Sequence, residues 1–249
     1  LLFRCDGMGP PPGAPGGDDA LDPVVLYQGG IEDPAVAWNG AHFAVVWSSS
    51  VKGGREILMQ RVGHDGHRLG EVVQISAVAG VNRKPAVVWT GNEWAIVFTN
   101  TAPVAGSEED RYRILFAAVP EAANRPRLTR RLEFQGSADR VALAATGEEY
   151  GVAWVGSKEP MGSAIYFHRL DGGGNPVGER VVVSDGTPLT CGRPDLAWAG
   201  DGFGVVWHDD REPAGSEVFF SFLSCGQAGA GPEAGTDAGA DGGPDAGAT

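Results

Sequence analysis

The sequence predicts an all-β protein of the β-propeller class, with four four-stranded blades closed by the N-terminal strand. Three observations predict this fold: a fragment that recurs four times, four apolar runs in each repeat, and the order of the runs at the two ends. The four copies read PAVAWNGAHFAVVW (34–47), PAVVWTGNEWAIVF (85–98), VALAATGEEYGVAW (141–154) and PDLAWAGDGFGVVW (194–207). Corresponding positions lie 51, 56 and 53 residues apart, which indicates one supersecondary unit per repeat.

Each repeat divides into short apolar runs separated by turn residues. In the first repeat, PAVAW precedes a turn at Asn39-Gly40, HFAVVW follows it, and EILMQRV and EVVQIS complete the set. An Asx-Gly pair between apolar runs is a strong hairpin signal. Four strands in about 50 residues are typical of a propeller blade, and no repeat carries a long 3.6-residue periodicity that would indicate a helix.

The two ends of the repeat region predict how the ring closes. PVVLYQGG (23–30) takes the place of a fourth, outermost strand, because EVVQIS, RLEFQ and RVVVS likewise precede the next repeat. EVFFSFLSC (217–225) is a third strand with no fourth strand after it. We therefore expect residues 23–30 to complete the last blade, which removes the exposed sheet edges. The alternative is a truncated ring of five or more blades.

Residues at fixed repeat positions predict the interior. Small residues in the first strand suit the narrow axis of a four-bladed ring, and this column reads Ala35, Ala86, Ala142 and Asp195. We expect three aromatic columns to pack between neighbouring blades, since each ring buries ~150–250 Å². These columns are Trp38, Trp89 and Trp198; Phe43, Trp94, Tyr150 and Phe203; and Trp47, Phe98, Trp154 and Trp207.

Three regions of the chain differ in composition. Residues 1–22 contain a Pro/Gly-rich linker, residues 23–225 hold the propeller, and residues 226–249 form a Gly/Ala/Asp-rich tail. Segments with so little apolar surface to bury cannot offset the entropy of ordering. We therefore expect a flexible linker and a disordered tail.

Charge and hydropathy restrict the partners. The 249-residue chain has a formal net charge of −13, and an acidic surface repels the phosphate backbone, which argues against nucleic-acid binding. No stretch approaches the roughly 20 apolar residues of a membrane-spanning helix. The few cysteines and the opening LLFRC favour a processed, exported protein, either secreted or held at the cell surface, and we expect a monomer.

The cysteines allow two fates for the N-terminal region. We expect a disulfide between Cys5 and Cys225, because the last third strand and the N-terminal linker meet on one face of the ring. Cys191 lies in a loop on the opposite face and should stay free. The alternative is a lipoprotein with a lipid on Cys5: Leu2 stands at the right distance, but Arg4 is unfavourable in a lipobox.

The pattern Trp-x-Gly…Val-Val-Trp occurs as Trp38-Asn39-Gly40…Val45-Val46-Trp47 and as Trp198-Ala199-Gly200…Val205-Val206-Trp207. On these residues the chain resembles repeat-bearing secreted bacterial β-propeller proteins over about 23–225. The third repeat departs from the pattern, with Ala145 in the place of the Trp. The tail resembles the stalks of surface proteins of predatory soil bacteria. The resemblance implies fold and export and no particular reaction.

Catalytic and cofactor motifs are missing from the sequence. It contains no P-loop, dinucleotide fingerprint, His-Glu-x-x-His or Gly-x-Ser-x-Gly, and Ser184-Asp185-Gly186 is only the start of a sialidase box. His64 and His67 fit a solvated hairpin turn better than half a metal site. We therefore assign no catalytic residue, no metal and no cofactor.

The remaining candidate site is a group of cations just before the first strand of each repeat. Asp33, Lys84, Arg140 and Arg193 share this position, and low-dielectric walls would focus the positive potential of three cations on an anionic ligand. We expect a binding site here, to which Asp195, Asp209 and Arg211 also contribute. Salt bridges around the ring are the alternative.

These observations favour an exported ligand-binding or surface-display module, whose ligand is an anionic small molecule or an acidic glycan. The alternative is an extracellular polysaccharide hydrolase or lyase that uses the same face. The two differ in what the site must contain, because an enzyme needs titratable groups that converge in one pocket.

Overall fold

The computed structural model describes residues 23–51, 53–103, 110–123, 125–133, 138–157, 162–184, 192–211 and 215–224. The predicted linker, the predicted tail and all three cysteines, including the expected Cys5–Cys225 pair, lie outside these residues. Within the described ranges the regular structure consists of 15 strands and no helix, as the sequence predicts for an all-β protein.

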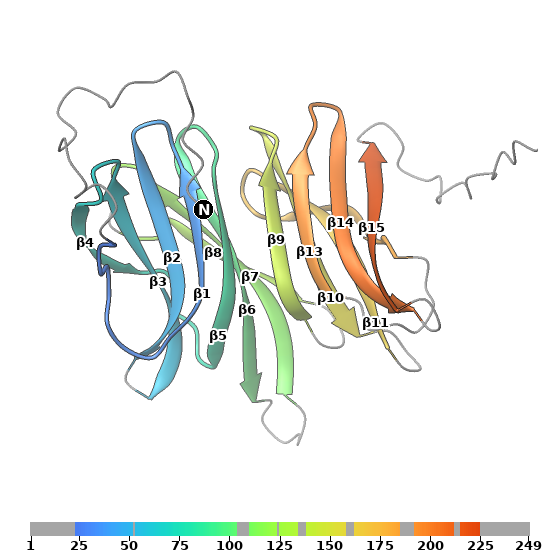
Figure 1. The fold of residues 1–249 in the computed structure, drawn as a ribbon, viewed down its shortest axis with the longest axis horizontal. Helices are drawn as coiled ribbons and strands as arrows, with labels where there is room; N and C mark the ends of the chain where they lie inside the picture. Colours follow the sequence, from blue (N-terminus) through green and yellow to red (C-terminus); the bar gives the residue numbers. More distant parts are fainter. Residues whose placement is uncertain are drawn as a thin grey trace, which may run out of the picture.

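The strands form four antiparallel meanders, which follow one another along the chain (Figure 1). The first meander consists of β1 (Ile31–Trp38), β2 (His42–Val51), β3 (Gly54–Gly63) and β4 (Arg68–Gln74). The second consists of β5 (Val81–Trp89), β6 (Glu93–Pro103), β7 (Asp110–Pro120) and β8 (Leu128–Glu133). The third consists of β9 (Ala138–Ala145), β10 (Glu149–Ser157), β11 (Ser163–Asp171) and β12 (Pro176–Val182). The fourth consists of β13 (Gly192–Trp198), β14 (Gly202–Arg211) and β15 (Gly215–Ser224).

The recurring Trp-x-Gly segment is the turn between the first two strands of a meander. Gly40, Gly91, Gly147 and Gly200 all have positive φ, between 98° and 105°, which glycine adopts without steric cost. In the first turn the Asn39 side chain accepts hydrogen bonds from the amides of Ala41 (2.9 Å) and His42 (2.8 Å). The sequence prediction of a hairpin at each repeat is therefore confirmed, and the glycine is required by the backbone.

The core lies between successive meanders and divides into three clusters. Ile57 and Met59 of the first meander pack with Ile96 and Phe98 of the second. The next cluster joins the second meander to the third, and the last joins the third to the fourth. A strand such as β10 is buried along nearly its whole length because its alternating side chains face neighbours on both sides of the sheet. Each fully buried large side chain contributes about 1.5–3 kcal/mol.

The aromatic columns pack in the clusters between meanders from the second meander on, as predicted, whereas Trp38 and Phe43 of the first meander are exposed. Trp89 and Trp94 contact each other at 4.8 Å between ring centroids, and Trp198 and Phe203 do the same at the equivalent positions. The small column lies in the first strands, which contact one another from each meander to the next. Ala35, Ala86 and Ala142 pack against the clusters between meanders and do not line the cavity of the site described below, because a first strand has neighbours on both faces.

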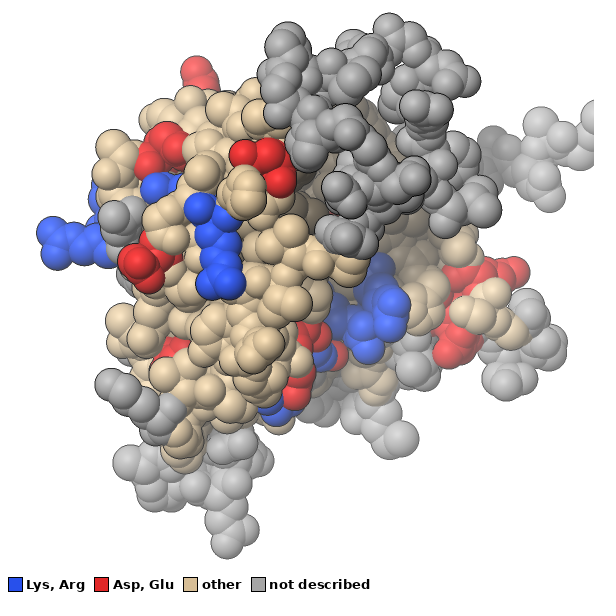
Figure 2. Space-filling view, turned by 60° about the vertical axis from the view of Figure 1, so that its left-hand side comes forward, with Lys and Arg blue, Asp and Glu red and all other residues tan. Residues whose placement is uncertain are grey.

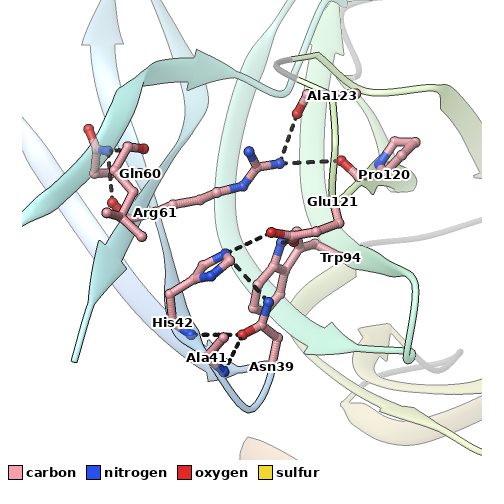
Figure 3. Close-up of polar contacts among 10 residues, drawn as sticks. Asn39, Ala41, His42, Gln60, Arg61, Trp94, Pro120, Glu121 and Ala123 are labelled. Carbon is pink, nitrogen blue, oxygen red and sulfur yellow. Dashed lines mark hydrogen bonds and ion pairs between the residues drawn. The ribbon is translucent and has the colours of Figure 1, made fainter.

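Polar contacts reinforce the boundary between the first and second meanders (Figure 3). Glu121 accepts a hydrogen bond from the Trp94 indole (3.0 Å) and pairs with His42 (3.0 Å). Arg61 donates from Nη2 to the carbonyl oxygens of Pro120 (3.2 Å) and Ala123 (2.8 Å). Side chains of the first meander thus satisfy backbone acceptors of the second.

The expected strand at 23–30 is not formed in this structure. Residues 23–28 have no regular secondary structure and lie against the first meander, where Arg68 donates to the Val25 carbonyl oxygen (3.2 Å). The Tyr27 ring contacts Trp47, with centroids 5.3 Å apart. These contacts hold the segment on the first meander, and β15 pairs only with β14 among the described strands.

Candidate functional site

One residue near the start of the first strand of every meander has a left-handed backbone conformation. The φ angles are 53° at Asp33, 52° at Lys84, 47° at Arg140 and 47° at Arg193. A β-bulge interrupts strand pairing at each of these positions. Non-glycine residues rarely adopt this conformation, and a bulge re-aims a side chain. Because all four meanders share the bulge, it is a property of the repeat, and only the side chain differs.

The four bulged residues line one cavity of about 340 Å³. Its lining is the bulged residue and its successor in each meander: Asp33, Pro34, Lys84, Pro85, Arg140, Val141, Arg193 and Pro194. The structure thus brings together the four residues that the sequence analysis placed at one mouth. On the face shown in Figure 2, acidic and basic side chains are interspersed. The chain has a net charge of −13, but three of the four bulged residues around this cavity are positively charged.

Carboxylates pair with some of these cations, as the salt-bridge alternative requires. Asp139 pairs with Lys84 and lies 3.7 Å from the Nε atom of Arg140. Within the described residues, Arg193 and Asp33 form no ion pair. The salt-bridge alternative therefore accounts for two of the three cations and leaves the third available.

Two other predicted site residues, Asp195 and Asp209, are not part of the cavity lining. Asp195 is exposed, and its carboxylate accepts a hydrogen bond from the Leu196 amide (2.8 Å). Asp209 is fully buried in β14 and does not line the cavity. The side chain at this position of β14 faces the protein interior, and no pattern in the sequence predicted this burial. The side chain of Arg211 lies outside the described residues.

The sequence did not predict a buried polar cluster between the first and second meanders. Asn100 donates to the Oδ1 atom of Asn82 (2.9 Å), and Asn82 donates to Glu56 (3.2 Å) and to the Arg55 carbonyl oxygen (3.0 Å). Ser76 also donates to Glu56. Both asparagines are fully buried, and the cluster joins the first meander to the second. Polar residues at strand ends were the only signal in the sequence.

A second cavity, of about 430 Å³, lies at the loop between β7 and β8. Its lining includes Arg125 and Arg127. Glu93 accepts hydrogen bonds from Arg127 at 3.0–3.2 Å, and this pairing raises the pKa of the guanidinium above its usual range. Nearby, burial raises the pKa of Tyr150 to about 12. Because Glu93 already pairs with the Arg127 guanidinium, this cavity is a weaker candidate for a ligand site than the first cavity.

Two features are absent from the described residues, a metal-binding cluster and a membrane-spanning helix. Within the described ranges, no group of three or more His, Cys, Asp and Glu side chains could hold a metal ion. The same ranges contain no helix that is long and apolar enough to cross a membrane.

Comparison with protein-family models and with curated protein sequences finds no match. The fold is similar to solved structures. A subtype N10 neuraminidase-like protein of A/little yellow-shouldered bat/Guatemala matches with a TM-score of 0.52 and 8% identity, over 77% of this chain and 58% of that one. A subtype N11 neuraminidase-like protein of A/flat-faced bat/Peru gives 0.52 and 10%, over 83% and 55%. The chain is a β-propeller.

A third match is the GH43 endo-arabinanase from Bacillus licheniformis, with a TM-score of 0.49 and 14% identity, over 78% of this chain and 73% of that one. At identities this low, the propeller likeness describes fold alone. The chain spans little more than half the length of the two neuraminidase-like proteins. The site must therefore be judged from the residues of this propeller.

Proposed function

We propose that this propeller binds an anionic ligand, the carboxylate or sulfate group of an acidic glycan or of an acidic small molecule, in the cavity at its mouth. The observation that carries the proposal is the set of three cations from three meanders, each on a left-handed bulge, around one cavity. Left-handed non-glycine backbone is costly and is often retained at functional sites.

The cations have distinct parts in this site. Arg193 has no ion-pair partner among the described side chains, so its guanidinium is available to bind an oxyanion bidentately. Asp139 holds Lys84 and Arg140 in place and lowers the positive charge that the ligand meets. The walls of the cavity focus the remaining field on the ligand.

Four blades around one axis are the architecture that supports this site. We propose that each meander is one blade, since each contributes one bulged residue to the cavity lining. Residues 23–30 complete the fourth blade as its outermost strand, and the ring is a monomer. The module works outside the cell, either secreted or anchored at the surface, as the resemblance to secreted propellers implies.

A hydrolase or lyase acting on extracellular polysaccharide is the second candidate. The likeness to proteins named as neuraminidase-like favours this candidate over a pure display role. The site also offers carboxylates beside cations, since Asp33 lines the cavity and Asp139 pairs at its rim. Acid–base cleavage needs such groups within reach of one bond.

The first experiment removes the cations. We expect Lys84→Gln, Arg140→Gln and Arg193→Gln together to abolish binding to polygalacturonate and to dextran sulfate, measured by calorimetry. A hydrogen bond to a charged group contributes about 1.5–3 kcal/mol, so each loss weakens binding by roughly tenfold or more. The ring should stay folded, because exposed ion pairs contribute little stability.

The matched control changes Arg68, Arg83 and Arg125 to Gln, which removes the same charge from positions outside the cavity lining. It should keep binding, and neutral dextran should bind neither protein. If both triple variants bound the polyanions equally weakly, the loss of binding would come from the change in net charge and not from the cavity. New reducing ends or a conjugated double bond after incubation of polygalacturonate with the unmodified protein would favour the enzyme candidate.

A further inference from the structure

The four bulged residues around the cavity of about 340 Å³ do not all carry the same charge. Asp33 of the first meander is acidic, and the residues of the other three are basic: Lys84, Arg140 and Arg193. The backbone is nevertheless the same in all four meanders, with φ between 47° and 53°. Because lysine and arginine hold this conformation in three meanders, the bulge itself does not account for a carboxylate in the first.

The first strands of the meanders form a row, with Asp33 and Arg193 on the two strands at its ends. β1 contacts β5, β5 contacts β9, and β9 contacts β13 (Figure 1). Asp33 lies on β1 and Arg193 lies on β13. Since both residues line the same cavity, the lining carries a negative group from one end of the row and a positive group from the other.

The two residues in the middle of the row share one carboxylate. Asp139 pairs with Lys84 and lies 3.7 Å from the Nε atom of Arg140. Asp33 and Arg193 form no ion pair with any residue that the structure describes. The lining therefore offers a ligand one carboxylate and one guanidinium that are not already matched by a charge within the described ranges.

The neighbouring acidic residue, Glu32, takes the other cations near the first strand. Its carboxylate lies 2.9 Å from the Nη2 atom of Arg55 and 3.7 Å from the Nε atom of Arg83. Arg55 and Arg83 are thus engaged by Glu32 and not by Asp33. The charge of Asp33 remains directed to the cavity that this residue lines.

The rest of the cavity lining is apolar. It consists of Pro34, Pro85 and Pro194, which follow the bulged residue in three meanders, and of Val141 in the other. Proline has no N–H group, so the backbone at these three positions donates no hydrogen bond to a ligand. The charged side chains of the bulged residues therefore select the ligand, and the proline rings contact its body.

We infer that the ligand of this cavity is zwitterionic, an amino sugar that also carries a sulfate or carboxylate group. Its ammonium group donates to the Asp33 carboxylate, and its oxyanion accepts from the Arg193 guanidinium. The inference rests on the proposed anion site and adds a cationic group to its ligand. A ligand with an anionic group alone leaves Asp33 unmatched and is repelled by it, which disfavours its binding. A cavity of about 340 Å³ lies at the small end of ligand sites, as one sugar unit requires.

The test compares two sugars that differ in the charge of one group. Glucosamine 6-sulfate carries an ammonium and a sulfate group, and N-acetylglucosamine 6-sulfate carries the sulfate group alone. Binding to the full chain is measured by NMR titration at about pH 6, where the amine is protonated. We expect glucosamine 6-sulfate to bind roughly tenfold tighter or more, because a hydrogen bond to a charged group changes affinity by at least that factor.

Substitutions of Asp33 assign the preference to this residue. Asp33→Asn should abolish the preference and leave the binding of N-acetylglucosamine 6-sulfate at least as strong. Asparagine adopts left-handed backbone readily, so this variant keeps the bulge. Asp33→Lys should reverse the preference, and Lys84 shows that the bulge accepts a lysine. The matched control is Asp201→Asn, at an exposed turn position outside the cavity lining, which should keep the preference.

The outcomes distinguish this inference from the proposed function. A preference for glucosamine 6-sulfate that Asp33→Asn abolishes and Asp201→Asn keeps supports the inference. Three results would overturn the inference alone: equal binding of the two sugars, binding of neither sugar while dextran sulfate binds, or a preference that Asp33→Asn leaves unchanged. If neither sugar and no polyanion bound, the proposed anion site would be wrong as well.

Discussion

The boundary between the third and fourth meanders and the seam between the fourth and the first use the same columns of residues in opposite environments. Phe203 is fully buried against the third meander, whereas Phe43, at the same repeat position, is 36% exposed. Leu196 is buried and Val36 is not. The residue types match, so burial at these positions depends on whether a neighbouring sheet is docked. Among the described residues, the fourth and first meanders thus expose the same columns that are buried at the boundaries between successive meanders.

The largest effect is expected at the formed boundary. Phe203→Ala should lower the free energy of unfolding by about 3–5 kcal/mol, because it removes a fully buried ring that contacts Phe167 and Trp198 and leaves a cavity. Urea denaturation measures the change. The control Leu69→Ala, at an exposed position of β4, should change the stability far less. Similar losses in both variants would mean that the fourth meander is not packed against the third.

The seam itself is tested by Phe220→Ala, compared with Phe167→Ala at the same repeat position of the third meander. If the ring closes as proposed, the loss for Phe220→Ala approaches that for Phe167→Ala, about 3 kcal/mol. Exposed positions tolerate such changes within about 0.5 kcal/mol. A loss that small for Phe220→Ala, next to a large loss for Phe167→Ala, would show that the seam is open in solution.

The smallest effect concerns the boundary between the second and third meanders and appears only at alkaline pH. Tyr150 packs on Phe116 at 4.9 Å, and burial raises its pKa from 10.0 to about 12. Between these values the unfolded chain has lost the phenolic proton while the folded chain keeps it. The free energy of unfolding therefore falls as the pH rises from 10.0 to about 12.

Tyr150→Phe should remove this component, so the variant loses less stability over the same pH range. Denaturation at a series of pH values measures the difference. Parallel curves for the two proteins would show that Tyr150 is accessible to water and that this boundary is looser than the structure describes.

Part of this fold could be predicted from the sequence because the same residue types recur at the same positions of each repeat. The turn glycines, the four strand runs and the aromatic columns recur at fixed spacing, and a recurring residue at a turn or in a core has a local physical cause. The grouping of Asp33, Lys84, Arg140 and Arg193 followed from the same logic, since equivalent positions in a ring of repeats lie around one axis. No residue type in the sequence predicted the left-handed bulge on which these four side chains lie.

Other features depend on contacts between distant parts of the chain. The burial of Asp209, the pairing of Asp139 with Lys84, and the Asn82–Asn100 cluster are set by how neighbouring meanders pack, which no local pattern encodes. The sequence by itself determined an all-β repeat fold and a cationic position in each of three repeats. Only the tertiary structure decided which cation has no ion-pair partner among the described residues, which acidic side chain is buried, and which sheet faces are exposed within the described part of the chain, because hydrogen bonds, ion pairs and burial depend on spatial neighbours.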